Sequence, residues 1–424
     1  MVSFKNGVLK IQRGEENTAR TIYEICFFAN TITLFAFNDV KFIGTATGFL
    51  MLFASIHLWI GRRAERVVIP YNTVWYALFT AFSAMSGLWS SYLNADMASY
   101  LLRMVVIVAM ITSISIYVDK PEDLERIIKI YIFSLLVIVL LEFSSIPISK
   151  WSDGLMGSHF SGSNPNGVAF IVFCAELMAF YEFYSKGKKW YIFLVVVFLA
   201  FIVLSGSRKA LFASVAGPIL FVLLSVYKKN YFFNIFAVLT IAALVLFFIM
   251  TDENAYNAIG KRVTSMLNFW FEDRERKVDG SLYMRSYYID LAQRMFSESP
   301  IVGKGMGNFA KIIDEVYMTH GVYSHNNYWQ ILSELGLVGF IIYYSLYFVT
   351  IVRLAKGAFI NKSRVNMLFL TFMILLLVIE VGLVTYNSKM PHIVIAIAYA
   401  ATYVSEMDGR QYSYIENNEM EESF

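Results

Sequence analysis

Long apolar segments dominate this chain and restrict its possible folds more than any other feature. Each segment extends over roughly 17–22 residues, and residues 128–148 and 366–385 are two examples. Helices of this length cross the apolar core of a bilayer, whereas transmembrane strands alternate in polarity over about 10 residues. The bilayer core offers no water to the backbone, so helices satisfy its hydrogen bonds internally. The sequence therefore predicts an all-α polytopic integral membrane protein.

The composition agrees with this class of protein. Of 424 residues, 58% are hydrophobic and 16% are charged, whereas soluble domains carry about 25% charged residues. The net charge of +3 indicates no particular partner, and we expect no nucleic-acid partner. Cys26 and Cys174 lie inside apolar segments, where they are expected to pack as apolar side chains. We predict about 12 transmembrane helices, near residues 21–37, 42–60, 73–90, 101–118, 128–148, 167–184, 190–205, 210–227, 231–250, 335–352, 366–385 and 389–405.

Lysine and arginine are distributed unevenly among the loops between these helices. The short loops on one side hold most of them, and by the positive-inside rule that side faces the cytoplasm. Both termini are then cytoplasmic, and no cleavable signal peptide is expected because residues 1–20 are polar. The predicted layout is a cytoplasmic N-terminal segment at 1–20, transmembrane helices 1–9 within 21–250, an extracytoplasmic loop at 251–325, transmembrane helices 10–12 within 326–405, and an acidic cytoplasmic tail at 406–424.

The long loop at 251–325 carries helical signals of its own. Met284, Tyr288, Leu291 and Met295 recur at helical spacing, so this stretch predicts an amphipathic helix that ends before Pro300. A second helix is expected near residues 309–318. Basic and acidic residues nearly balance in this loop, so an anion would have to be bound by particular arginines. We therefore expect an ordered cap on the membrane surface.

A short turn, Ser205-Gly-Ser-Arg208-Lys209, joins two apolar segments with almost no loop. Burying a charged group at this depth in the membrane costs free energy, so such groups are kept where they pair with another charge or face a cavity. In the functional interpretation, Arg208 binds an anionic head group, because guanidinium makes bidentate contacts to phosphate. In the structural interpretation, the arginine extends to the membrane interface from a helix end. The sequence does not decide between them.

Other ionisable residues fall at the same predicted depth, namely Arg103, Glu142 and Glu380. They either form structural ion pairs or line the wall of a cavity. Gly303-Lys-Gly-Met-Gly307 resembles a phosphate-binding loop superficially, but it follows no strand, so we expect a tight turn.

A polar stripe begins the predicted tenth helix. His325 is followed by Asn326, Gln330 and Glu334, and the last three recur every four residues on one helix face. Such a stripe requires a polar cavity, and a histidine there has a suitable pKa to act as a base. The alternative is an interfacial histidine with only structural contacts. No metal-ligand cluster or paired acidic motif accompanies it, so neither a metal nor another cofactor is expected.

Four motifs in this order resemble the O-antigen ligase and O-antigen polymerase (Wzy-type) superfamily of bacterial membrane glycosyltransferases. Asn164-Pro-Asn166-Gly opens the sixth helix, and Ser205-Gly-Ser-Arg208 matches a Ser-x-Ser-Arg turn. Arg285 to Phe309 matches a stretch with an arginine, a helix and Pro-x-x-Gly-x-Gly-x-x-Phe. His325-Asn326 to Gly339 matches a His-Asn … Glu-x-Gly-x-x-Gly helix, and the resemblance covers roughly residues 150–400.

The resemblance implies an enzyme that transfers a glycan from polyprenyl diphosphate to an acceptor without a metal, at the outer face of the bacterial plasma (inner) membrane. Arg208 and Arg285 would bind the diphosphate leaving group, and His325 would activate the acceptor hydroxyl. Residues that would bind substrate are Asn326, Gln330, Glu334, Asn164, Asn166, Lys209 and Arg103. The implied partners are the lipid-linked donor, a glycan acceptor, the bilayer, a flippase and a chain-length regulator.

The preferred function is polymerisation of lipid-linked repeat units into a surface polysaccharide, such as O-antigen, capsule or exopolysaccharide. An O-antigen ligase that transfers the glycan to lipid A core or protein is the alternative within the same class. A transporter or flippase of lipid-linked glycans is the alternative from another class, but it predicts short loops and buried charge at the membrane midplane.

Overall fold

The computed structural model describes residues 2–36, 41–62, 70–90, 95–147, 165–225, 280–317 and 322–404. Asn164, the helix predicted at 231–250, the first part of the long loop and the acidic tail lie outside these residues. Within the described ranges the secondary structure is helical and contains no strand. The all-α fold class is therefore confirmed for this part of the chain.

The described part of the chain contains the following helices in order. They are α1 (Val2–Ala36), α2 (Lys41–Gly61), α3 (Tyr71–Met85), the 3-10 helix η1 (Ser86–Leu88), α4 (Ala95–Tyr117), α5 (Pro121–Ser145), α6 (Pro165–Lys186), α7 (Tyr191–Leu204), α8 (Arg208–Ser225), α12 (Gly280–Glu298), α13 (Asn308–Tyr317), α14 (Asn327–Phe359) and α15 (Arg364–Glu380). A final helix runs over residues 389–404.

Six of the described helices are long and apolar enough to cross a membrane. They lie at Phe42–Gly61, Met97–Tyr117, Pro121–Ser145, Pro165–Lys186, Arg208–Ser225 and Asn327–Phe359. The helix α7, with 14 residues, is apolar but shorter, and α3 and α15 have 15 and 17 residues. The protein is thus a helical membrane protein, and the total of 12 spans stays a prediction.

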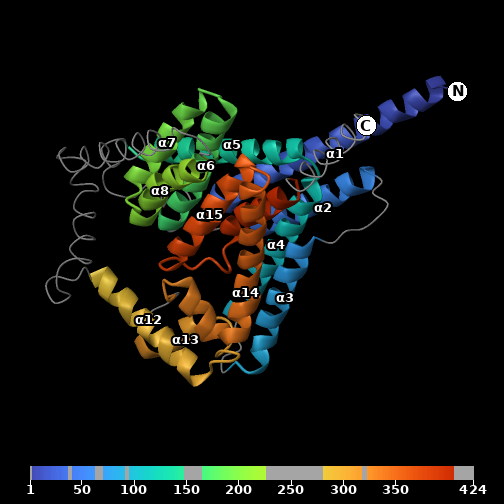
Figure 1. Ribbon diagram of the computed structural model, residues 1–424. Coiled ribbons are helices and arrows are strands. Elements are labelled where there is room, and N and C mark those ends of the chain that lie inside the picture. Colours follow the sequence, from blue (N-terminus) through green and yellow to red (C-terminus); the bar gives the residue numbers. More distant parts are fainter. Residues whose placement is uncertain are drawn as a thin grey trace, which may run out of the picture.

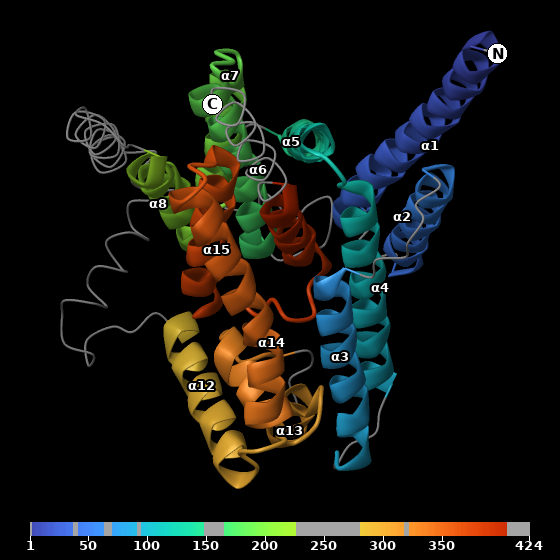
Figure 2. The ribbon, with the colours of Figure 1, turned by 45° about the vertical axis from the view of Figure 1, so that its right-hand side comes forward.

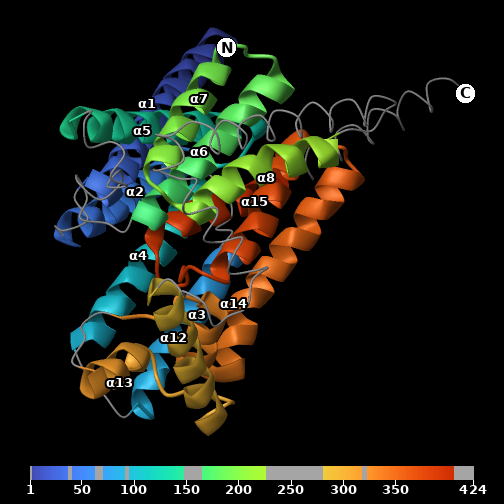
Figure 3. The same ribbon diagram turned by 90° about the vertical axis from the view of Figure 1, so that its left-hand side faces the viewer.

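The helices form two groups that meet where α5 contacts α6 and that are also bridged by the C-terminal part of the chain (Figures 1 and 2). In one group α1 packs against α2 and α5, and α2 packs against α4; in the other α6 packs against α7 and α8. The helix α14 contacts both α3 and α15, and α15 in turn contacts α6 and α8. Figure 3 shows α12 and α13 at one end of the molecule, next to α3 and the first half of α14.

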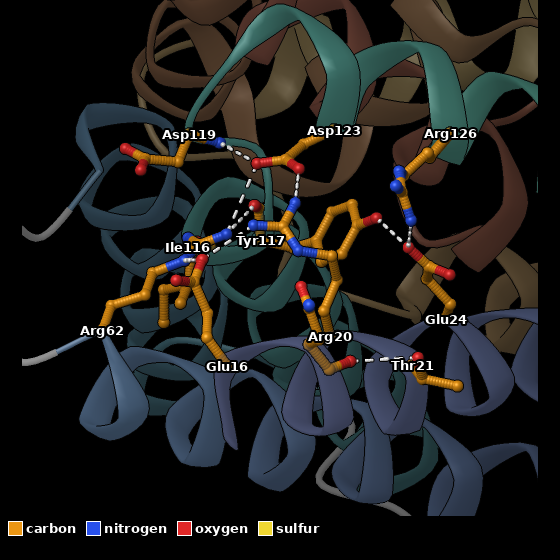
Figure 4. A network of polar contacts seen from close by, with 11 residues as sticks. Glu16, Arg20, Thr21, Glu24, Arg62, Ile116, Tyr117, Asp119, Asp123 and Arg126 are labelled. Carbon is orange, nitrogen blue, oxygen red and sulfur yellow. Dashed lines mark hydrogen bonds and ion pairs between the residues drawn. The ribbon is translucent and has the colours of Figure 1, made fainter. Parts of the chain in front are cut away.

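A network of charged groups ties the first group of helices together at the end that the sequence predicts to be cytoplasmic (Figure 4). Asp123, in the first turn of α5, pairs with Arg20 of α1 and with Arg62 beyond α2, the latter at 3.4 Å. Arg62 also donates to the carbonyl oxygen of Tyr117 at 3.0 Å, where α4 ends. The Tyr117 hydroxyl donates to Glu24 at 2.7 Å. These contacts pair a buried carboxylate with two guanidinium groups and connect four helices.

A break in α14 shapes the opposite end of the molecule. Gly336 has φ 63° and ψ −166° inside α14, a conformation that is essentially restricted to glycine. A Cβ at this position would lie 2.4 Å from the carbonyl carbon and oxygen of Ile301. Beyond the break, the amide of Leu337 donates to the carbonyl oxygen of Pro300 at 2.9 Å. The glycine therefore admits the backbone of the preceding loop.

The glycine-rich loop at 300–307 satisfies the backbone groups that this break exposes. The amide of Lys304 donates to the carbonyl oxygen of Ser333 at 3.0 Å, and that of Gly305 donates to Glu334 at 2.8 Å. Three glycines in the loop have positive φ angles, at residues 303, 305 and 307. The loop is thus a tight turn packed on α14, as the sequence predicted, and its amides at 304 and 305 are directed to protein carbonyls rather than to a phosphate.

Candidate functional site

The amphipathic helix α12 is held by an apolar cluster. Tyr288, Ala292 and Met295 of α12 pack against Phe309 and Ile313 of α13. The predicted helices in the loop are thus confirmed, and α12 ends at Glu298, before the proline, as expected. This packing fixes α12 beside the start of α14 and places Arg285, which is half-buried, near the N-terminal end of α12.

His325 lies immediately before α14 in a strained conformation. Its φ angle is 58°, which is uncommon for a residue other than glycine and often occurs at functional sites. Its imidazole is enclosed by two aromatic rings, Tyr323 at 4.2 Å and Tyr288 at 6.2 Å between ring centroids. The Ser324 hydroxyl donates to the carbonyl oxygen of Asn326 at 2.7 Å, closing the turn that carries the histidine.

The two asparagines after His325 have separate structural roles. Asn326 caps α14, because its side-chain oxygen accepts from the amide of Trp329 at 3.1 Å. The side-chain oxygen of Asn327 accepts from the amides of Thr385 and Tyr386 at 2.9 and 3.0 Å. Asn327 thereby holds the connection at 381–388 against the start of α14. The sequence interpretation missed this residue and this connection.

Gln330 and Glu334 continue the polar stripe, but they face protein groups. Gln330 accepts from the amide of Ser324 at 2.7 Å and donates to Glu334 at 3.0 Å. The other carboxyl oxygen of Glu334 accepts from the hydroxyl of Tyr386 at 2.7 Å. Both side chains are buried. The stripe therefore links the histidine turn to the connection at 381–388, and its expected contact with substrate stays a prediction.

The turn before α8 presents two cations at a helix N-terminus. Gly206 has φ 67°, and the Ser207 hydroxyl accepts from the amide of Ala210 at 3.4 Å, so Ser207 caps the helix. Arg208 and Lys209 follow as its first two residues, both half-buried. The Lys209 ammonium donates to the carbonyl oxygen of Gly382 in the 381–388 connection. Cations are unfavourable at a helix N-terminus, where an anion is favoured.

Arg285, Lys209 and His325 come together from three different elements. The pKa of His325 is lowered from 6.5 to about 4 by burial and by the nearby charges of Arg285 and Lys209. The charges of Arg285 and Lys209 also act on each other. No carboxylate in the described part of the chain forms an ion pair with Arg285 or Lys209. This cationic cluster is suited to an anionic ligand.

Other residues predicted for the site lie in different surroundings. Arg208 is adjacent to Lys209, and its predicted contact with the diphosphate stays a prediction. Asn166 is half-buried in the first turn of α6. Arg103 lies on α4 with its guanidinium carbon 5.4 Å from the centroid of the Tyr100 ring.

The sequence placed Glu380 either in an ion pair or on a cavity wall, and in the structure its carboxylate accepts hydrogen bonds from hydroxyl groups. The hydroxyls of Tyr344 and Tyr347 donate to it at 3.0 and 2.9 Å, and Thr385 donates as well. Glu176 accepts from the hydroxyl of Ser214 and so joins α6 to α8. Both carboxyl groups are buried and hydrogen-bonded, so they stabilise the packing of the helices.

Residues 168–344 match the family model described as O-antigen ligase. The matched region contains the α8 turn, α12, the glycine-rich loop and the histidine turn, and it supports the superfamily that the sequence motifs resemble. Members of this family are glycosyltransferase-like enzymes that act on lipid-linked glycans. No curated protein matches the chain.

Proposed function

We propose that this chain, which carries an O-antigen ligase domain, is a polymerase of polyprenyl-diphosphate-linked oligosaccharide repeat units. It would build a surface polysaccharide at the outer face of the bacterial plasma membrane. The observation that carries the proposal is the cluster of Arg285, Lys209 and His325. Arg285 and Lys209 are cations without a carboxylate partner among the described residues, and His325 is a neutral imidazole. The cluster lies beside α12 and α13, which are outside the predicted membrane spans.

The charges in the cluster fit the leaving group of such a reaction. In the proposed step the bond between the anomeric carbon and the diphosphate oxygen breaks, and its electron pair leaves with the polyprenyl diphosphate. Arg285, Lys209 and Arg208 would stabilise that developing negative charge, which is where preorganised cations lower a barrier most. The reaction needs no redox partner, because one carbon–oxygen bond replaces another.

His325 would act on the acceptor side of the same step. A sugar hydroxyl attacks the anomeric carbon opposite the diphosphate, which inverts the centre, and its proton passes to the imidazole. In the free protein the low pKa of about 4 keeps His325 neutral at neutral pH. A bound diphosphate offsets the charges of Arg285 and Lys209, so it raises the pKa of His325 toward the range of an effective base.

The test is reconstitution of the purified protein in nanodiscs with a polyprenyl-diphosphate-linked repeat unit as both donor and acceptor. We expect a ladder of products that His325→Ala abolishes. Transfer to lipid A core without any ladder would identify a ligase instead. Movement of the lipid-linked glycan across vesicle membranes with no new glycosidic bond would refute the enzyme class and indicate a transporter.

A further inference from the structure

A second pair of cations lies outside the cluster described above. Lys389 begins the final helix, and Arg103 lies on α4 three residues before Val106, whose side chain is 2.8 Å from the Cβ position at Gly48 of α2. The charges of Lys389 and Arg103 act on each other. The Lys389 ammonium is 3.7 Å from the Cβ position at Gly44, within the first turn of α2. Both side chains are half-buried. Neither forms an ion pair with a carboxylate of the described ranges.

This pair is therefore in the same electrostatic situation as the first cluster. Two like charges repel each other, and the N-terminal ends of α2 and of the final helix add partial positive charge. The adjacent aromatic ring of Tyr100 offers Arg103 only a weak partner. A phosphate-bearing anion that bridges Arg103 and Lys389 would offset both the repulsion between the two charges and the positive charge of the helix ends.

The connection at 381–388 links the two cationic sites directly. Lys209 binds Gly382 near its beginning, and Lys389 follows its last residue. Seven residues in a fully extended chain span about 25 Å, which is an upper limit for the distance between the Cα atoms of Gly382 and Lys389. The connection turns at Thr385, whose carbonyl oxygen accepts from the amide of Ser388 at 2.8 Å, so the separation is shorter.

We propose that Arg103 and Lys389 bind the diphosphate of a second polyprenyl-diphosphate-linked glycan, which serves as the acceptor. The inference rests on the proposed function and distinguishes a polymerase from a ligase, because both substrates of a polymerase carry a lipid diphosphate. The acceptor glycan would extend from this site past the connection at 381–388, and its sugar hydroxyl would reach the donor at His325. Only the donor diphosphate leaves; the acceptor keeps its own bond to diphosphate.

The primary test counts binding sites and does not depend on catalysis. Farnesyl diphosphate, a short polyprenyl diphosphate, is titrated into the full-length protein in neutral detergent by calorimetry. We expect two sites in the wild type. Arg103→Gln/Lys389→Gln is expected to keep one site, with the other weakened about tenfold to a hundredfold, which corresponds to the loss of charged hydrogen bonds. Lys209→Gln/Arg285→Gln is expected to keep the other site.

Two controls separate this effect from misfolding and from general loss of charge. Arg103→Lys/Lys389→Arg preserves both charges and is expected to keep two sites. Lys304→Gln removes a cation from the glycine-rich loop, where Lys304 pairs with Glu298, and is expected to keep two sites as well. Equal melting temperatures for all variants show that the fold is intact. A single site in the wild type, or two unchanged sites in Arg103→Gln/Lys389→Gln, refutes the proposal.

Two further measurements identify the source of the phosphate and the role of the site. Nanodiscs of phosphatidylglycerol and of phosphatidylcholine are compared; loss of the second site only in phosphatidylglycerol would mean that it binds a lipid headgroup, and the proposal would fail. For separate KM values, the donor has its acceptor hydroxyl blocked and the acceptor carries a non-cleavable phosphonate in place of the sugar–phosphate bond. Arg103→Gln/Lys389→Gln is expected to raise KM for this acceptor about tenfold, with KM for the donor changed less than about twofold. Two binding sites without any glycosyl transfer would refute the proposed function separately.

Discussion

The low pKa of His325 leads to a specific prediction about the pH dependence of catalysis. With a pKa of about 4, more than about 90% of His325 is neutral at pH 5.5, whereas an ordinary histidine with a pKa near 6.5 is only about 10% neutral there. The acid limb of kcat/KM for the donor, which reports the free enzyme, should therefore lie near pH 4. We expect kcat/KM to be nearly constant between pH 7 and pH 5.5.

The same electrostatics predict a different acid limb for kcat. Once the diphosphate is bound, its negative charge offsets Arg285 and Lys209, so the pKa of His325 rises. Since kcat reports the enzyme–substrate complex, its acid limb should lie at higher pH than that of kcat/KM. In Lys209→Gln one repulsive charge is absent, and the acid limb of kcat/KM should move upward from pH 4.

An independent readout assigns these limbs to His325. Diethyl pyrocarbonate modifies neutral imidazole, and mass spectrometry of the peptide that contains His325 follows its modification as a function of pH. The modification should fall only near pH 4 in the free protein and at higher pH with farnesyl diphosphate bound. His325→Ala should lower kcat by about 10²–10⁴-fold, the usual effect of losing a base. Acid limbs of kcat and kcat/KM that coincide near pH 6.5 would refute this electrostatic account.

Four further predictions test other parts of the site and fold. Arg208→Lys and Arg285→Lys should each lose polymer at wild-type protein levels, measured by gel analysis, because an ammonium does not reproduce bidentate contact with phosphate; normal polymer from both would exclude that role. Gly336→Ala should lower the melting temperature strongly, since its Cβ would lie 2.4 Å from backbone atoms of Ile301 and its φ is positive; a native melting curve would contradict this. EDTA should leave glycan transfer intact, and loss restored by magnesium would reveal a metal site. Reporter fusions at residue 290 should give an extracytoplasmic signal, and a cytoplasmic signal would overturn the topology.

The helical loop shows how far local sequence patterns carry. The spacing of Tyr288, Leu291 and Met295, together with Pro300, predicted α12 and its end, and the structure confirms both. A helix is encoded locally, because its hydrogen bonds join residues four apart and its apolar face recurs with the helical period. The same reasoning identified the apolar helices and the turn before α8. It also identified the motifs that resemble the O-antigen ligase family.

The partners of the polar groups could not be predicted in this way. The sequence placed Gln330 and Glu334 on one helix face but not against Ser324 and Tyr386. It also did not reveal Asn327 as the contact that holds the connection at 381–388. These contacts join segments whose relative positions are set only when the helices pack.

The cationic cluster depends on tertiary structure in the same way. Arg285 and His325 were predicted as site residues from their motifs, but the pKa of the histidine depends on burial and on distances to Arg285 and Lys209. Lys389 and Arg103 are far apart in the chain, and only packing of the final helix beside α2 and α4 makes them neighbours. The sequence alone thus determined the helices, the membrane class and the motifs, because each depends on neighbouring residues. Which charges meet was decided by tertiary packing, because electrostatic interactions depend on distance in space and on exclusion of water.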